Sequence, residues 1–161
     1  MNPEFRKHPP ESLASVPFDI PRPFETTLSN GLRVVIFENE RLPLVSYRLA
    51  FFAGDIDETE NGRGLVSAMA LLLTEGTENY SSQQLAEKIE RLGAGISAHS
   101  SSDFTTIAAS SLSFYTSAIF EMLSEIILKP TFPESEIDLY RRNLLENLKF
   151  QRSQPPFLAS E

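Results

Sequence analysis

The chain has 161 residues, of which 41% are hydrophobic and 22% are charged. This length suits one domain or a piece of a larger protein, and the composition is that of an ordinary soluble globular protein. Fourteen Lys and Arg residues against 22 Asp and Glu residues give a formal net charge of −8. Such a charge repels phosphate groups and anionic lipid headgroups, so we expect neither nucleic acid nor an acidic membrane surface as a partner.

The sequence has no cysteine, which excludes disulfides, thiolate metal sites and a cysteine nucleophile. No apolar run approaches the roughly 18 residues that a membrane span needs. The first residues carry charges and prolines where a signal peptide needs an apolar run, so any export signal has been removed from this chain. We therefore expect a soluble protein, and the sequence does not choose between cytoplasm and periplasm.

Residues 1–24 are rich in proline, which lacks a backbone N–H group and disfavours both helix and sheet. We interpret this segment as an extended arm on the surface of a domain, and plain disorder is an equally good interpretation. Residues 25–161 are predicted to form the folded part.

An Asn30-Gly31 turn between two β-prone runs predicts a hairpin over residues 25–28 and 32–38. Residues 44–53, rich in Val, Tyr, Leu and Phe, are predicted to form a third strand. An acidic turn over residues 55–62 follows.

Residues 64–73 are apolar on nearly all sides, which predicts a central buried helix. Ser81 and Gln84 have the spacing of a capping box for a second, amphipathic helix, which should run to Leu92 and stop at Gly93.

The alternation over residues 96–101 and 104–112 predicts a two-stranded ribbon. Two further helices are predicted over residues 114–128 and 134–151, the first ending before Pro130. Strands and helices in mixed order favour an α+β sandwich.

Histidine is scarce, because only His8 and His99 are present. A catalytic zinc ion needs three protein ligands, usually led by His or Cys, so the chain cannot supply the usual set. A Ser-His-Asp site would have to use one of these two residues. His99 precedes three serines and Asp103, but neighbours in a strand point to opposite faces, so we interpret His99 as an ordinary strand or surface residue.

Four carboxylates lie close together in the acidic turn, at Asp55, Asp57, Glu58 and Glu60. Carboxylate oxygens can bind Ca²⁺, but the cluster lacks the regular ligand spacing and glycine of a Ca²⁺ loop. We favour a solvated acidic loop over a metal site.

Several short motifs follow one another in an order and spacing that resemble the pitrilysin or insulinase-type (M16) zinc metallopeptidases. The resemblance covers roughly residues 25–152 and rests on residues 28–35, Pro43, Gly54, Gly64-Leu65, residues 75–77, residues 89–95, Ser97-Ala98 and residues 130–132. It implies a two-layer α+β sandwich, with a mostly antiparallel sheet and helices on one face, like the first part of an M16 domain.

In that family the buried helix carries an inverted zinc motif, His-x-x-Glu-His. Counted forward from Gly64, the three motif positions of this sequence hold Ser67, Ala70 and Leu71. The spacing would place all three on one helical face. The family's third ligand, a glutamate on a later helix, falls on Asn147 or on its neighbour Glu146.

These residues cannot hold zinc in the family's manner, and none on the helix can act as the general base. The resemblance implies zinc as the family cofactor, and we predict that this chain lacks zinc and the family's peptide hydrolysis.

The resemblance also implies an edge strand that accepts extended peptides by main-chain pairing. The corresponding residues are Ile96, Ser97, Ala98, His99 and Ser100. An alternative is that a partner covers this edge or that it is merely exposed.

The hypothesis of first choice is a non-catalytic M16-like domain that binds peptide or pairs with an active M16 homologue or a second M16-like domain. A structural scaffold subunit of a larger complex is the alternative, and an active zinc-dependent metalloendopeptidase is the second. Family members generally continue beyond the point where this chain ends, so we expect a fragment whose uncovered apolar faces favour self-association.

Overall fold

The computed structural model describes residues 21–158, which fall into two compact units, residues 21–41 and residues 42–158. The expected proline-rich arm lies mostly outside the described residues, and its last residue, Phe24, begins a strand. The boundary between arm and domain at residues 24 and 25 stays a prediction. Among residues 21–158, no helix combines the length and apolar character that crossing a membrane requires.

The first unit contains one antiparallel hairpin, formed by β1 (Phe24–Thr27) and β2 (Arg33–Ile36). The turn between them has Gly31 at φ 86°, a left-handed conformation that glycine adopts without strain. The Asn30 side chain accepts a hydrogen bond from the Leu32 N–H at 3.1 Å. The predicted Asn-Gly hairpin is confirmed, with the second strand ending two residues earlier than expected.

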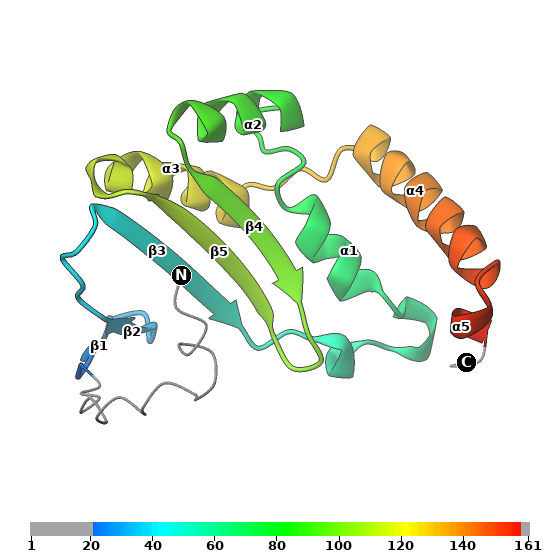
Figure 1. Ribbon diagram of the computed structural model, residues 1–161, viewed down its shortest axis with the longest axis horizontal. Coiled ribbons are helices and arrows are strands. Elements are labelled where there is room, and N and C mark those ends of the chain that lie inside the picture. Colours follow the sequence, from blue (N-terminus) through cyan, green and yellow to red (C-terminus); the bar gives the residue numbers. More distant parts are fainter. Residues whose placement is uncertain (1–20, 159–161) are drawn as a thin grey trace, which may run out of the picture. The chain divides into compact units, whose positions relative to one another are not determined.

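The second unit is built on an antiparallel sheet with the strand order β3-β5-β4 (Figure 1). Its strands are β3 (Leu44–Phe51), β4 (Gly95–Ser100) and β5 (Thr105–Leu112). The register pairs Arg48 with Ala108, and Ala108 in turn with Ser97. β4 and β3 are therefore the two edges of this sheet.

Helices cover one face of the sheet. They are α1 (Leu65–Leu72), α2 (Ser82–Arg91) and α3 (Thr116–Leu128), the last preceded by the 3₁₀ turn η4 (Ser113–Tyr115). Side chains from the sheet and these helices form one core: Ala70, Leu73, Leu85, Ala98, Ile107, Ala109, Ile119, Met122, Leu123 and Ile126. The α+β class with a mostly antiparallel sheet and helices on one face is confirmed.

The helix α2 begins as its sequence predicts. The Ser81 hydroxyl accepts a hydrogen bond from the Gln84 N–H, and the Gln84 side chain accepts one from the Ser81 N–H at 3.0 Å. The helix ends at Arg91, and Gly93 follows in a left-handed conformation.

One sequence-based expectation about α1 is wrong. The helix is not buried all round, because Leu65 and Leu71 are 67% and 47% exposed while Ala70 and Leu72 are buried. The physical reason is its position beside the edge strand β4, where the sheet offers cover on one side only (Figure 1).

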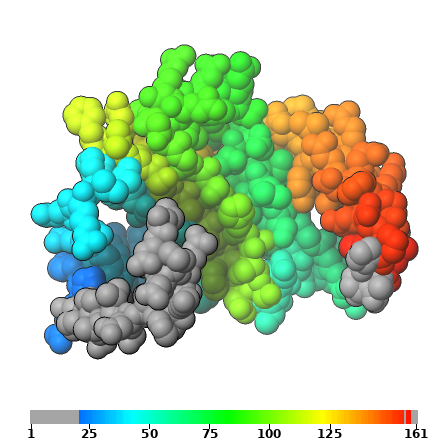
Figure 2. All heavy atoms as spheres, viewed as in Figure 1, coloured from blue at the N-terminus to red at the C-terminus, as the bar shows by residue number. Residues whose placement is uncertain are grey.

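The chain ends with α4 (Glu134–Arg152), as predicted, and a short α5 (Pro155–Leu158), which the sequence analysis did not predict. No residue of α4 is buried, and Figure 2 shows α4 and α5 as a projecting lobe beside α1. This helix therefore presents most of its apolar side chains to the surface.

Candidate functional site

The first position of the family's zinc motif, Ser67, is tied to the sheet. Its hydroxyl lies 2.7 Å from the hydroxyl of Ser100, the last residue of β4. Both side chains are half-buried. The residue at the position of the family's first metal ligand thus links α1 to the edge strand β4 through a hydrogen bond.

The other two motif positions have different environments. Ala70 is 1% exposed and belongs to the core, whereas Leu71 is 47% exposed. The predicted common face is therefore split between core and surface. On α4, Asn147 is exposed, and the carboxylate of Glu146 accepts a hydrogen bond from the Lys149 amine at 2.8 Å.

This donor set does not fit a zinc ion. A methyl and an isobutyl group have no lone pair to donate, and the Ser67 hydroxyl is engaged with Ser100. In the part of the chain from residue 21 to residue 158, no three His, Cys, Asp or Glu side chains lie close enough together to hold a metal ion. The family's hydrolytic chemistry has neither its ligands nor its base at these positions.

The predicted peptide-binding residues lie together in β4. Within the described residues this strand pairs with β5 only, so its outer side is an unpaired edge. Ile96, Ala98 and Ser100 point to the helix-covered face, and Ser97 and His99 to the opposite face. The structure confirms the strand; peptide binding to it stays a prediction.

Ser100, the serine next to His99, does not form a Ser-His-Asp site with it. Ser100 lies on the helix-covered side of the sheet, where it contacts Ser67, while His99 is exposed on the other side. The Ser101 hydroxyl donates to the carbonyl of Phe104 at 2.9 Å within the turn that follows β4.

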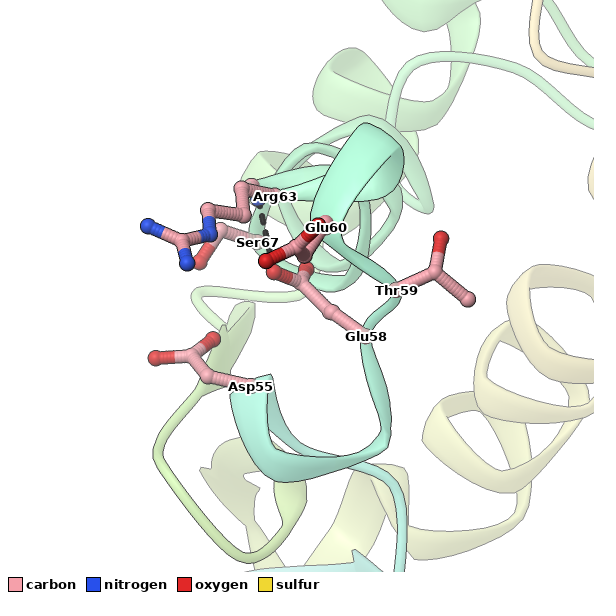
Figure 3. A pocket seen from close by; sticks show the side chains of 7 residues that line it. Asp55, Glu58, Thr59, Glu60, Arg63 and Ser67 are labelled. Carbon is pink, nitrogen blue, oxygen red and sulfur yellow. Dashed lines mark hydrogen bonds between the residues drawn. The ribbon is translucent and has the colours of Figure 1, made fainter.

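A pocket of about 530 Å³ opens between the loop of residues 55–64 and the start of α1. It is lined by a mostly charged set of side chains, which Figure 3 shows: Asp55, Glu58, Thr59, Glu60, Arg63, Gly64 and Ser67. The Asp55 and Arg63 side chains extend toward the same side in this view, while Thr59 points the opposite way.

Glu58 fixes one wall of this pocket. Its carboxylate accepts hydrogen bonds from the N–H groups of Gly64 and Val66, both at 2.7 Å. These donors belong to the first turn of α1, where N–H groups have no partner within the helix and negative charge is favoured. Glu58 therefore caps the helix with a side chain from the preceding loop.

Gly54, just before this loop, packs closely against the backbone that follows β4. A Cβ atom at this position would lie 2.7 Å from the carbonyl carbon of Asp103, so only glycine fits. The loop is also joined to the turn after β4 by hydrogen bonds from the Asp55 and Ile56 N–H groups to the carbonyls of Ser101 and Ser102.

The acidic residues of this loop do not converge on one point. The Asp57 carboxylate accepts a hydrogen bond from the Gly54 N–H at 3.0 Å, and Glu58 is turned toward α1. The loop forms two 3₁₀ turns, η2 (Asp55–Asp57) and η3 (Glu60–Gly62). Two of the four carboxylates, those of Asp57 and Glu58, are thus engaged with backbone N–H groups, and the absence of a Ca²⁺ site stays a prediction.

The model of the insulinase family, Peptidase family M16, matches residues 33–160. The chain belongs to this family.

Curated relatives agree with this assignment. The beta subunit of the mitochondrial-processing peptidase of Mus musculus is 30% identical over 139 residues, which are 86% of this chain and 28% of the relative. An uncharacterized zinc protease of Bacillus subtilis is 24% identical over 129 residues, or 80% of this chain and 32% of the relative. The chain thus spans about a third of the length of these relatives.

Solved structures have the same fold. An inactive M16 peptidase domain from Pseudomonas fluorescens superposes with a TM-score of 0.80 at 26% identity, covering 86% of this chain and 34% of that one. A protease from Helicobacter pylori superposes with a TM-score of 0.73 at 20% identity, covering 83% of this chain and 32% of that one.

Two features of the site were missed by sequence reasoning. The capping role of Glu58 depends on a loop conformation that brings a side chain to residues six and eight positions later, and no helix motif has that spacing. The second is Arg48 of β3, which is exposed and forms no ion pair within residues 21–158; its exposure could have been predicted from the alternation of residues 44–51.

Proposed function

We propose that this chain is a non-catalytic M16 domain that pairs with an active M16 homologue or a second M16-like domain and offers β4 as an edge for an extended peptide. The observation that carries the proposal is the state of the motif helix. Ala70 is packed into the core at the position of the general base, and Ser67 is bonded to Ser100 at the position of the first ligand.

The absence of the family's general base at position 70 is consistent with a stable core. A histidine or glutamate at position 70 would place a polar group in a site that is 1% exposed, and an unpaired polar group in such a site is costly. Alanine at position 70 lets the helix pack on the sheet without that penalty. An inactive domain of the same family with a TM-score of 0.80 supports the proposal.

Peptide binding at β4 asks little of side-chain chemistry. An added strand forms hydrogen bonds with backbone groups, which every residue except proline supplies in full. The outer edge of β4 has these groups available within the described residues, and no proline interrupts Gly95–Ser100. The edge can therefore persist where catalysis does not.

Pairing is supported by exposed apolar residues and by the relatives. Three leucines of α4 form an exposed stripe at helical spacing, namely Leu144, Leu145 and Leu148. Relatives at comparable identity are described as a subunit of the mitochondrial-processing peptidase and as subunit 1 of the cytochrome b-c1 complex of Rattus norvegicus. The second relative favours the runner-up function, a structural subunit of a larger complex.

Peptide titration followed by amide chemical shifts separates the two functions. We expect an extended neutral peptide to cause saturable shifts in residues 96–100, and the same peptide with alternate N-methylated amides to cause none. A folded protein that gives no saturable response to the unmethylated peptide would favour the scaffold role and contradict peptide binding.

A further inference from the structure

The face of the three-stranded sheet opposite the helices has a distinct composition. We name this face the open face. Strand alternation and register place the following residues on it: Leu44, Ser46, Arg48, Ala50, Gly95, Ser97, His99, Thr106, Ala108, Ser110 and Leu112.

The assignment of the two faces follows from contacts on the other side. The Tyr47 hydroxyl lies 3.1 Å from the Thr116 hydroxyl of α3, and the Tyr47 ring packs against Phe120 with centroids 5.1 Å apart. Ile107 and Ala109 of β5 are buried in the core beneath the helices. Their neighbours along each strand therefore point away from the helices.

The open face has no carboxylate, although the whole chain has a net charge of −8. Its permanent charge is the guanidinium of Arg48, which is exposed and has no ion-pair partner among the described residues. This part of the surface is thus cationic on an otherwise acidic protein, which is a local charge complementary to an anion.

The neighbours of Arg48 leave its guanidinium accessible. Ala50 follows it on the same face of β3, and Ala108 lies opposite it on β5. Hydroxyl groups surround this pair at Ser46, Thr106 and Ser110, the positions two residues away on the same two strands. A guanidinium with nearby hydroxyl donors is suited to a carboxylate, which accepts a bidentate hydrogen bond from arginine.

An apolar pair lies at one end of the open face. Leu44 and Leu112 are opposite each other in the register and are 55% and 43% exposed. Leu44 is four residues from Arg48, a distance of roughly 13 Å along an extended strand. A ligand that contacts both features must present an anionic and an apolar group at that separation.

We propose that the open face binds an extended acidic peptide segment, with a carboxylate on Arg48 and an apolar side chain about four positions away on Leu44 and Leu112. This site lies on a different surface from the backbone edge of β4 and goes beyond the function proposed above. It would give the domain a preference among peptides or partner segments that edge pairing alone does not supply.

The test uses a blocked peptide of Ser and Thr residues with one Leu and one Glu four positions apart, titrated into the full chain. We expect saturable amide shifts in residues 46–50 and 106–110, and weaker binding as salt is raised. Arg48→Gln should weaken binding about fivefold, as expected for an exposed ion pair worth about 1 kcal/mol, and Arg48→Lys should restore part of it.

Arg142→Gln is the matched control, because it makes the same charge change on exposed α4 and should leave the affinity unchanged. A peptide with Gln in place of Glu, or with Ala in place of Leu, should bind more weakly. Equal affinity of the Arg48→Gln protein and the control, or equal binding of the Glu and Gln peptides, would overturn the inference. So would the absence of any binding.

The outcome also separates the two peptide sites. Shifts confined to residues 96–100, insensitive to Arg48→Gln, would overturn the open-face site while supporting the β4 edge. Shifts in residues 46–50 without any response of the β4 edge to neutral peptides would support the open-face site and contradict edge binding.

Discussion

The Ser67 and Ser100 hydroxyls, 2.7 Å apart, join the motif helix of an M16 domain to its edge strand. In this chain the helix face that resembles a metal site therefore has a structural task. The hydrogen bond holds α1 against the end of β4, next to the pocket that the 55–64 loop encloses.

Removing either hydroxyl should lower stability. We expect Ser67→Ala and Ser100→Ala each to reduce the free energy of unfolding by about 1 kcal/mol, because each leaves the other half-buried hydroxyl without its partner. The double variant should lose less than the sum of the two. Urea unfolding of all four proteins checks this, and strictly additive losses would show that the two hydroxyls do not interact.

Restoring the family's glutamate should be harmful. Ala70→Glu places a carboxylate in a core position that is 1% exposed, and we expect it to cost about 3 kcal/mol of folding free energy. Leu71→His, at a position that is 47% exposed, is the control and should cost less than about 1 kcal/mol. Thermal and urea denaturation would detect the difference, and equal stability of the two variants would contradict the packing described for α1.

The cap on α1 gives a third expectation. Glu58→Ala removes two hydrogen bonds to the Gly64 and Val66 N–H groups and a favourable interaction with the helix dipole, so it should destabilise the protein by about 1 to 2 kcal/mol. Glu60→Ala, on the same loop and exposed, is the matched control. If both substitutions have the same small effect, Glu58 is not the cap.

The stability of the protein should depend on pH through the protonation of Glu75. Burial raises the pKa of its carboxyl group, and the negative charge of Glu136 raises it further. The folded state therefore binds this proton more tightly than the unfolded state, and the contribution of Glu75 to stability falls as pH rises from the unfolded pKa through the folded pKa.

Glu75→Gln should accordingly raise stability at neutral pH, and the gain should shrink as pH falls below the usual carboxyl pKa. Glu90→Gln, on the exposed face of α2, serves as the control for the loss of one charge. Urea midpoints measured from pH 4 to pH 7 would show the trend. A gain for Glu75→Gln that is independent of pH would rule out the protonation explanation.

Local signals in the sequence predicted much of the fold. The Asn30-Gly31 turn, the Ser81 capping box and the alternation of Thr105–Leu112 each report a conformation fixed by residues close together in the chain. These interactions need no knowledge of the tertiary structure.

Other features depend on which elements become neighbours. Leu65 and Leu71 are exposed because α1 lies beside an edge strand. The composition of the helix does not indicate where in the fold the helix will lie. The division of Ser67, Ala70 and Leu71 between strand contact, core and surface has the same origin. The motif positions could be counted from the sequence, but their environments could not.

Zinc binding by the full chain measures whether the altered motif positions still form a metal site. The purified protein is equilibrated with zinc, dialysed, and analysed for metal per chain. We expect no stoichiometric zinc and no chelator-sensitive peptide cleavage, since Ser67, Ala70 and Leu71 do not supply a ligand set. One retained zinc per chain, accompanied by cleavage that a chelator abolishes, would contradict this expectation.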